Sequence, residues 1–464
     1  MPRDIVSIYR TRLAREKGAV KKDWGGRLSV ALTYPNYYRL GMSNLGFQVV
    51  YDILNQRSDV VAERVFLPEG QEMSLYLQSG KSLMSLESQT PLQKFDLVAF
   101  SLSFENDYPH ILSILDNIGL PLRAEHRGDE DPLLLAGGVA SFINPESIAP
   151  FFDCFLIGEA EVILPRFIKI FNPGNSKHAT LISIARNVQG AYVPAFYRVD
   201  YQPDGTIASF SPLEDVPPSV TRTYLKDLTR TATCSAILTS DTTFDRTYMI
   251  EVGRGCPHGC RFCSAGFIYR PPRFRPISEL IKNINQGICQ TRRIGLVGSA
   301  VSDLPGIGDL CVQYMNEDVR LSFSSLRADK ISTELLSALA QSKVKTATIA
   351  PDAGSERMRK VINKGITEEA ILAAAEALVA NGIPNLKLYF MIGLPTETEE
   401  DQEKSLDLVR WICNKGGTVR AHYLTPLPGT PYASVTPTEI SDKVRRELGK
   451  LALHGKLTGY WEKH

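Results

Sequence analysis

Short apolar runs alternate with amphipathic segments along the front half of the chain. The apolar runs cover residues 28–35, 95–104, 132–140 and 152–161, and helical spacing of apolar residues follows at 41–54 and 108–118. Strands that alternate with helices predict a parallel doubly wound sheet of Rossmann or flavodoxin type, in which ligands bind at the carboxyl ends of the strands. We therefore expect an α/β domain over residues 25–195.

The same alternation resumes at Thr247 and continues through the back half. Candidate strands are residues 248–253, 293–299, 320–325, 346–351, 386–393 and 419–426. Between the fourth and fifth of these strands, Thr367 is expected to cap the start of a helix, and Gly382 is expected to end it. Six strand-helix units over residues 246–435 predict a partial (β/α)6 barrel of TIM-like type, with its site at the carboxyl ends of the strands.

Three segments lie outside these two domains. Residues 1–24 are rich in Arg and Lys and are expected to form a solvated basic helix. Residues 196–245 contain several prolines and little periodicity, so we interpret them as a connector. Residues 436–464 are expected to form a C-terminal helix with a basic, solvated face.

Composition and charge place the chain among globular proteins. Of its 464 residues, 43% are hydrophobic and 22% are charged, and 52 basic against 51 acidic side chains give a net charge of +1. This balance supplies no broad field for nucleic acid, so a nucleic-acid partner is not indicated. No apolar run is long enough for a membrane span and the N-terminus has no secretory pattern, so we expect no membrane partner and a cytoplasmic location.

The strongest chemical signal is a C-x3-C-x2-C run at Cys256, Cys260 and Cys263, directly after the first strand of the back half. Thiolates so close in sequence can hold one polynuclear iron-sulfur cluster, and three thiolates leave one iron open for another ligand. A zinc site completed by His258 is the alternative. The other cysteines are expected to be buried packing residues: Cys154, Cys234, Cys289, Cys311 and Cys413.

This motif, with the aromatic Phe262 before its third cysteine, resembles the signature of the radical S-adenosylmethionine (radical SAM) superfamily. The resemblance covers about residues 245–435. It implies a 4Fe-4S cluster on Cys256, Cys260 and Cys263, with S-adenosylmethionine on the fourth iron. It also implies reductive cleavage of S-adenosylmethionine to a 5′-deoxyadenosyl radical that attacks an unactivated carbon, and an electron donor such as flavodoxin or ferredoxin.

The resemblance also implies cofactor contacts at the ends of the later strands. Lys364 follows the fourth strand and is expected to be either a cofactor contact or a surface cation. The residues that match positions near S-adenosylmethionine are Phe262, Gly298, Ser299, Ser325, Arg327, Asp352, Ser355 and Gly393. No catalytic residue and no substrate can be named from these motifs.

The front domain resembles the B12-binding class of the superfamily, and more closely an uncharacterised bacterial branch of that class. The segments 34–48 and 137–161 carry this resemblance. It implies a possible cobalamin site bordered by Gly137, Gly138, Gly158 and Glu159, although glycine-rich turns are also required by the fold alone. The Asp-x-His-x-x-Gly motif that supplies an axial histidine in other B12 proteins is absent. Asp107 and His110 have a different spacing, and His110 is expected on a helix surface.

RNA methylthiotransferases are a rival family with the same barrel signature. Their N-terminal domain carries three further cysteines for a second cluster, whereas the front domain of this chain holds only Cys154. Since 38 residues follow the sixth expected strand, we do not expect the RNA-binding barrel of that family. The sequence therefore favours a radical SAM enzyme with a cobalamin-type front domain over methylthiolation and over a zinc-stabilised binding module.

Overall fold

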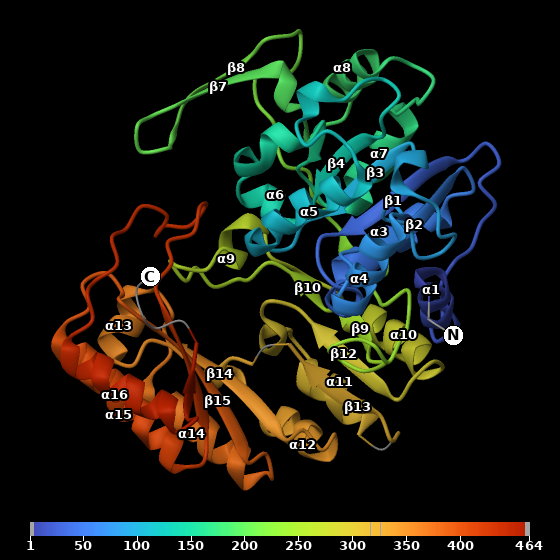
Figure 1. Cartoon of the computed structure of the whole chain (residues 1–464). Coiled ribbons are helices and arrows are strands. Elements are labelled where there is room, and N and C mark those ends of the chain that lie inside the picture. The colour runs from blue at the N-terminus through green and yellow to red at the C-terminus, as the bar shows by residue number, and fades with distance from the viewer. Residues whose placement is uncertain (1–3, 316, 325, 460–464) are drawn as a thin grey trace. The chain divides into compact units, whose positions relative to one another are not determined.

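The computed structural model describes residues 4–315, 317–324 and 326–459. It divides the chain into two compact units (Figure 1). Unit 1 comprises Met1–Lys226 and Thr233–Arg246, and unit 2 comprises Asp227–Ala232 and Thr247–His464. Among the helices of the described ranges, none is both long and apolar enough to cross a membrane.

Unit 1 is built on a six-stranded sheet with the order β2-β1-β3-β4-β5-β6. The first five strands are parallel and β6 is antiparallel, which confirms the doubly wound sheet that the sequence predicts. The strands are β1 (Leu28–Tyr34), β2 (Val60–Phe66), β3 (Leu97–Ser101), β4 (Leu133–Gly137), β5 (Cys154–Leu156) and β6 (Ala191–Tyr192). Because β1 and β3 are neighbours, their carboxyl ends form the switch point at which such sheets bind ligands.

Helices accompany the strands of unit 1. The longer ones are α1 (Ile5–Ala14), α3 (Leu45–Gln56), α4 (Gly70–Ser79), α5 (Tyr108–Ile118), α7 (Ala160–Ile170) and α8 (Lys177–Asn187). Short helices α2 (Tyr38–Gly41) and α6 (Val139–Ile143) follow β1 and β4. The strands β1 and β2 are almost wholly buried, as parallel strands covered on both faces are.

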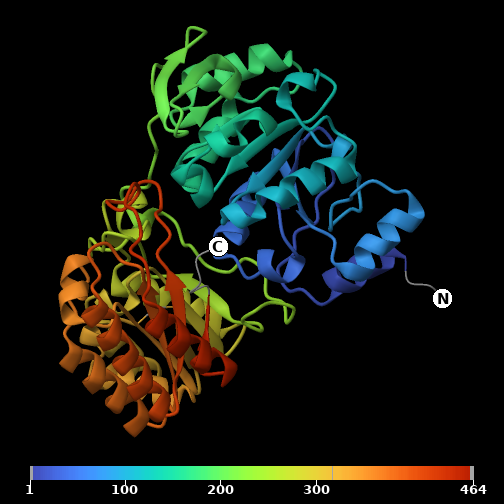
Figure 2. The same cartoon turned by 60° about the vertical axis from the view of Figure 1, so that its left-hand side comes forward.

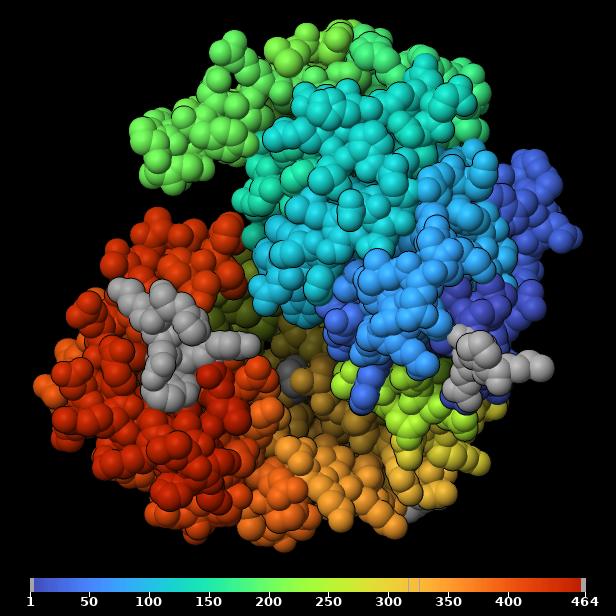
Figure 3. Space-filling model, in the orientation of Figure 1, coloured from blue at the N-terminus to red at the C-terminus, as the bar shows by residue number. Residues whose placement is uncertain are grey.

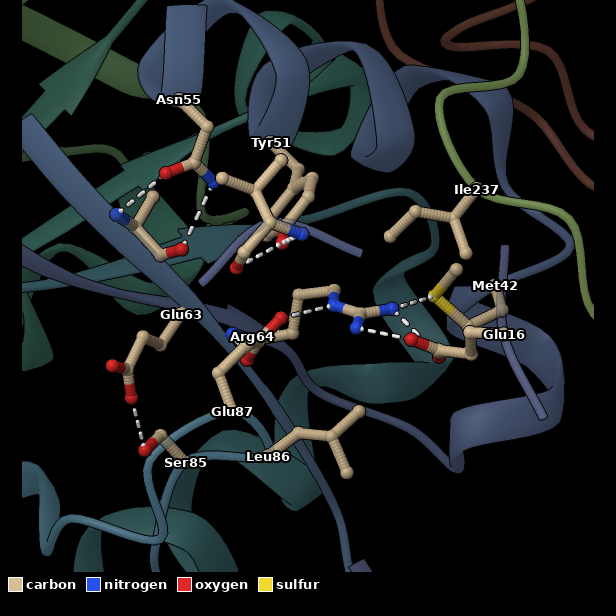
Figure 4. Close-up of polar contacts among 12 residues, drawn as sticks. Glu16, Met42, Tyr51, Asn55, Glu63, Arg64, Ser85, Leu86, Glu87 and Ile237 are labelled. Carbon is tan, nitrogen blue, oxygen red and sulfur yellow. Dashed lines mark hydrogen bonds and ion pairs between the residues drawn. The ribbon is translucent and has the colours of Figure 1, made fainter. Parts of the chain in front are cut away.

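A buried ion network joins three segments of unit 1 (Figure 4). Arg64 on β2 contacts Glu16 through Nη2 (2.6 Å) and Glu87 through Nε (2.7 Å). The side chains of all three residues are at most 2% exposed. Glu87 Oε2 also accepts the backbone N–H of Arg64 at 2.7 Å. The network therefore ties the segment after α1 and the loop after α4 to the sheet.

The segment predicted to be a connector contains an antiparallel hairpin, β7 (Tyr197–Tyr201) and β8 (Ile207–Pro212). Figure 3 shows this hairpin projecting from the rest of unit 1, and Tyr201 and Ile207 on it are about half exposed. Tyr197 is buried and stacks on Phe210, but most other residues of the two strands are exposed. Sequence analysis missed these strands because they contain few apolar residues in an alternating pattern.

After the hairpin, the chain alternates between the two units. Residues 227–232 belong to unit 2, where the carbonyl oxygens of Leu228 and Thr231 accept hydrogen bonds from the buried Arg275. Residues 233–246 return to unit 1, where Ile237 N–H donates to Gln48 Oε1 at 3.1 Å. Only from Thr247 does the chain stay in unit 2.

Unit 2 contains the six predicted parallel strands in chain order. They are β9 (Tyr248–Glu251), β12 (Arg293–Val297), β13 (Arg320–Phe323), β14 (Thr346–Asp352), β15 (Asn385–Ile392) and β16 (Thr418–Tyr423). The first three and the last three form two sheets joined by a single parallel bridge between Leu326 and Ile349, and β17 (Leu457–Thr458) extends the second sheet. The described strands thus form an open rather than a closed barrel.

The longer helices of unit 2 pack against these strands or against a neighbouring helix (Figure 2). They are α10 (Ile277–Ile288), α11 (Ile307–Tyr314), α12 (Thr333–Gln341), α14 (Glu368–Ala380), α15 (Glu399–Asn414) and α16 (Asp442–Leu453). The short helices α9 (Ala265–Ile268) and α13 (Glu356–Val361) lie in the loops after β10 and β14. The predicted cap of α14 is confirmed, since Thr367 Oγ1 accepts the N–H of Ala370. The loops at the carboxyl ends of the strands are left to build a site.

Candidate active site

The loop with the three cysteines leaves the barrel just after β9 and is closed at its base. The short strands β10 (Gly253–Arg254) and β11 (Arg273–Phe274) pair antiparallel on either side of it. Gly255 has φ +76°, and a Cβ there would lie 2.6 Å from the carbonyl oxygen of Tyr269. Only glycine fits this position without strain, so the sequence Gly-Cys fixes where the loop begins.

Two hydrogen bonds hold this loop against the segment after α13. Arg261 N–H donates to the carbonyl oxygen of Ile362 at 3.0 Å, and Asn363 Nδ2 donates to the carbonyl oxygen of Gly259 at 2.8 Å. Phe262 packs onto a small apolar cluster of unit 2 that includes Met358 and Leu394. The aromatic residue thus anchors the loop by packing.

The three thiols lie in a partly buried environment that suits a cluster. Cys260 is 7% exposed, and burial raises the pKa of its thiol to about 11, while Lys364 opposes the shift. Burial also raises the pKa of Cys256, and both thiols interact electrostatically with Cys263. Binding of iron must therefore displace protons from these thiols.

The donor set distinguishes a cluster from a single metal ion. Within the described ranges, no three His, Cys, Asp or Glu side chains are arranged around one ion. The thiolates of a polynuclear cluster each bind a different iron, so they need not converge on one point. His258, the expected fourth ligand of a zinc site, instead directs Nε2 to Asp303 Oδ1 at 2.8 Å. Three thiols without a fourth donor fit a cluster with one open iron.

Paired charges lie near Cys260, at the end of β14 and on the segments that follow β13 and α13. Lys364 Nζ lies 2.6 Å from Asp352 Oδ2, and both side chains are nearly buried. Although burial lowers the pKa of Lys364, the ion pair with Asp352 outweighs it and raises that pKa. Arg327 Nη2 donates to the carbonyl oxygen of Lys364 at 2.6 Å. Lys364 is therefore a held cation near Cys260, and not the surface cation that was one expectation.

Asp352 has an unusual backbone conformation. Its φ is +62°, and the register between β14 and β15 shifts at this residue. A left-handed conformation is costly for a residue other than glycine, and such residues concentrate at functional sites. The bend turns the carboxylate toward Lys364.

The ends of β12 and β13 are tied together near the expected cofactor contacts. Ser324 Oγ donates to the carbonyl oxygen of Gly298 at 2.9 Å, and the N–H of Gly298 donates back at 3.1 Å. Ser299 is exposed, and Ser325 lies outside the described residues. Gly298 is thus placed at the strand ends as predicted, while no contact tests the roles of the two serines.

Ser355 and Gly393 stabilise the turns after β14 and β15. Ser355 is 2% exposed, accepts the N–H of Met358 as the cap of α13 and donates to Asp401 Oδ1 at 2.6 Å. Its hydroxyl is occupied within the protein. Gly393 has φ +74°, and its N–H donates to Glu397 Oε2 at 2.7 Å.

Glu397 holds the turn after β15, a role that sequence analysis did not assign to it. Its carboxylate also accepts the N–H of Leu394 at 3.1 Å, and burial raises its pKa to about 7 despite both hydrogen bonds. The sequence feature that could have indicated this role is an acidic residue four positions after Gly393, the glycine that follows β15. Glu397 fixes the loop that carries Gly393.

The glycines expected near a corrin in unit 1 serve the fold. Gly138 has φ +106°, and a Cβ there would lie 2.4 Å from the carbonyl oxygen of Leu102. A Cβ at Gly158 would lie 2.0 Å from Thr223 Oγ1, and the buried Glu159 accepts the N–H of Leu225 at 2.9 Å. A Cβ at Gly137 would lie 3.7 Å from the carbonyl oxygen of Leu156, an ordinary contact that does not require glycine. The presence of Gly138, Gly158 and Glu159 at these positions is thus explained by the fold alone.

The other cysteines are only partly as expected. Cys154 and Cys311 are buried, whereas Cys289 at the end of α10 is exposed and Cys234 and Cys413 are half-buried. The prediction was wrong for Cys289 because the residue lies at the solvent side of a helix end, where periodicity is a weak guide.

Comparison with known proteins identifies both halves of the chain. Residues 46–194 match the family "Radical SAM proteins, N-terminal", and residues 250–409 match the "Radical SAM superfamily". The uncharacterized protein MJ0966 of Methanocaldococcus jannaschii is 31% identical over 387 residues, which are 83% of this chain and 74% of that protein.

Two further similarities are more distant. A tRNA-2-methylthio-N(6)-dimethylallyladenosine synthase of Chloroherpeton thalassium is 28% identical over 224 residues, and the match covers 45% of this chain and about half (49%) of that enzyme. The radical S-adenosylmethionine methyltransferase TsrM from Kitasatospora setae has a similar fold, with a TM-score of 0.55, 14% identity and coverage of 87% of this chain and 75% of TsrM. A second structure, TsrM with cobalamin and a [4Fe-4S] cluster bound, gives a TM-score of 0.54.

Proposed function

Because the chain belongs to the radical SAM superfamily, we propose that Cys256, Cys260 and Cys263 hold the [4Fe-4S] cluster at which this enzyme cleaves S-adenosylmethionine to modify an unactivated carbon. The observation that carries the assignment is the closed loop of three thiols beside the buried Lys364. When bound and reduced, the cluster supplies the electron that breaks the sulfonium bond.

The residues around the loop prepare the site. Lys364 and Arg327 place positive charge beside Cys260, which stabilises thiolates and the negative charge of a bound cluster. The open iron and the ends of the next strands would hold S-adenosylmethionine, with Gly298, Ser299, Ser325, Arg327, Asp352 and Gly393 as the contacts that we propose. Ser355 would act indirectly, since its hydroxyl is bound to Asp401.

We further propose that unit 1 holds a corrinoid, so that the modification is a methyl transfer. The support is the fold shared with TsrM, whose structure contains cobalamin, and the switch point between β1 and β3 in the strand order of the sheet. The carbon that is modified belongs to a substrate whose class the site does not name. A low-potential protein of flavodoxin or ferredoxin type would supply the electron.

Methylthiolation of RNA has less support, although part of unit 2 is similar to a tRNA methylthiotransferase. The front half of the chain holds only Cys154 before residue 234, and this residue is fully buried on β5. A second cluster in unit 1 would therefore have no set of thiolates.

The test is anaerobic reconstitution with iron and sulfide, followed by reduction in the presence of S-adenosylmethionine. We expect 5′-deoxyadenosine and methionine from the wild type and none from Cys260→Ala. Cys289→Ala is the matched control, because this thiol is exposed and outside the loop. Equal product from Cys260→Ala, or bound zinc with no cleavage, would overturn the assignment.

A further inference from the structure

Unit 1 places a histidine and a carboxylate at the switch point of its sheet. Pro35 and Asn36 directly follow β1, while Asp107 and His110 lie at the start of α5, which follows β3. Since β1 and β3 are parallel neighbours, these residues meet at one edge of the sheet. This pair has the spacing Asp-x-x-His, which differs from the Asp-x-His motif of other B12 proteins.

The contacts of His110 determine which ring nitrogen carries the proton. Nδ1 lies 2.9 Å from the carbonyl oxygen of Pro35 and 3.6 Å from Asp107 Oδ1. A carbonyl oxygen only accepts, so Nδ1 is the donor and, in the neutral ring, Nε2 keeps its lone pair. Asn36 Nδ2 donates to Asp107 Oδ1 at 2.7 Å and fixes the carboxylate in turn.

Nε2 of His110 is available to a ligand. The side chain is 34% exposed, and the described residues provide no partner for Nε2. A histidine whose other nitrogen is held by a carbonyl or carboxylate is the usual arrangement of a metal-ligating imidazole. His110 lies on α5 and is partly exposed, as expected of a helix-surface residue, but its ring is also held by the carbonyl oxygen of Pro35, directly after β1.

Buried polar atoms at the same edge are also unsatisfied. Asp107 Oδ2, Tyr108 Oη and Ser141 Oγ are buried without a hydrogen-bond partner in the described part of the chain. Asp107 is only 4% exposed and Ser141 is fully buried. Each such atom costs about 1–3 kcal/mol, so three at the ends of β3 and β4 indicate an edge that a ligand completes.

We propose that His110 Nε2 is the axial nitrogen ligand to the cobalt of a corrinoid bound at this edge of unit 1. The inference rests on the proposed function, in which unit 1 holds a corrinoid. The carboxamide side chains of a corrin ring offer both N–H donors and carbonyl acceptors. They match the needs of Asp107 Oδ2, which requires a donor, and of the Tyr108 and Ser141 hydroxyls, which can donate to an acceptor or accept from a donor.

The test uses the full-length protein labelled with [15N]histidine and loaded with cob(II)alamin. Electron paramagnetic resonance then separates the two sources of an axial nitrogen. A protein 15N splits each cobalt line into a doublet, whereas the 14N of the cofactor's own base gives a triplet. We expect the doublet in the wild type and in His126→Ala, whose side chain is 64% exposed on η3 (Ala124–His126).

We expect His110→Ala and His110→Gln to lose the doublet while they retain the corrinoid, as measured by absorbance after gel filtration. Corrinoid that is retained by the wild type with a triplet, or without nitrogen splitting, would overturn the role of His110 and leave the corrinoid site standing. Failure of the wild type to retain corrinoid would overturn both. The 5′-deoxyadenosine assay would then show separately whether the cluster assignment stands.

Discussion

Replacement of Arg64 tests whether its ion network stabilises unit 1. Arg64→Met keeps an unbranched apolar chain of similar length but removes the guanidinium between Glu16 and Glu87. Both carboxylates then remain buried, because their side chains are at most 2% exposed in the folded protein. Loss of one partner from a buried ion pair costs about 3–5 kcal/mol, since the other charge is left without compensation.

This loss has a measurable size. Unit 1 contains about 240 residues, and for domains of this size each kcal/mol lowers the melting temperature by roughly 2–4 °C. We therefore expect the melting temperature of unit 1 in Arg64→Met to fall by roughly 6–20 °C. A triple variant that also carries Glu16→Gln and Glu87→Gln should recover most of the loss, because no buried charge remains.

Trp24 allows unit 1 to be observed by itself. Its Nε1 donates to Glu63 Oε1 at 2.9 Å and its ring packs on Phe95, so its fluorescence reports the folding of unit 1. Urea unfolding is measured in a background where the other two tryptophans of the sequence are replaced by Phe. Arg198→Ala, which removes an exposed ion pair on the hairpin, is the control and should leave the midpoint unchanged.

Two results would refute the reasoning. A loss below about 1 kcal/mol in Arg64→Met would show that the carboxylates do not remain buried and charged. A triple variant as unstable as Arg64→Met would show that the loss comes from packing rather than from charge.

Three further predictions concern unit 2. The pKa of Glu397 is raised to about 7 by burial, so the folded state holds its proton over a range where the unfolded state has lost it. The stability from this group is fully present below about pH 4 and is lost as the pH rises through 7. In urea titrations, the free energy of unfolding of the wild type should therefore fall between pH 4 and pH 8 by about 3 kcal/mol more than that of Glu397→Gln. An equal change in the two proteins would contradict this. Ser355→Ala removes a helix cap and should lower the stability in urea by about 1–2 kcal/mol, and an unchanged midpoint would count against the cap. Gly354→Ala places a Cβ 2.1 Å from Ser405 Cα. We expect calorimetry to show a loss of stability of about 1–3 kcal/mol. Gly128→Ala, where a Cβ would meet no atom within 4 Å, should leave the stability unchanged.

Local sequence patterns predicted β1, β3, β4 and β5 of unit 1, the six parallel strands β9, β12, β13, β14, β15 and β16 of unit 2, and the cysteine loop, but not β2 or β6. The expected strand at 346–351 corresponds to β14 and that at 386–393 to β15. In both strands buried apolar residues alternate with less buried ones, and turn residues follow. The spacing of Cys256, Cys260 and Cys263 is equally local, since all three lie in one loop. Both kinds of signal need no knowledge of distant residues.

Pairs between distant segments could not be predicted in the same way. His258 meets Asp303 across 45 positions, and Arg357 and Ser355 meet Asp401 across more than 40. The left-handed backbone of Asp352 has no sequence signal either, because the residue most tolerant of it is glycine. Pairing of this kind depends on which strand ends the fold brings together.

The alternation of the chain between the two units has a consequence for its synthesis. Residues 227–232 leave the ribosome before the last segment of unit 1, yet the carbonyl groups of Leu228 and Thr231 have their partner in Arg275, which is about 45 residues further on. Arg275 follows Arg246, the last residue of unit 1, by 29 positions. At 5–20 residues per second, these carbonyls wait in water for roughly 1.5–6 seconds after unit 1 can close. An N-terminal fragment that ends at Arg246 would therefore contain every residue of unit 1. A C-terminal fragment that begins at Thr247 would leave the buried Arg275 without these acceptors, so the two halves are unequal candidates for separate expression.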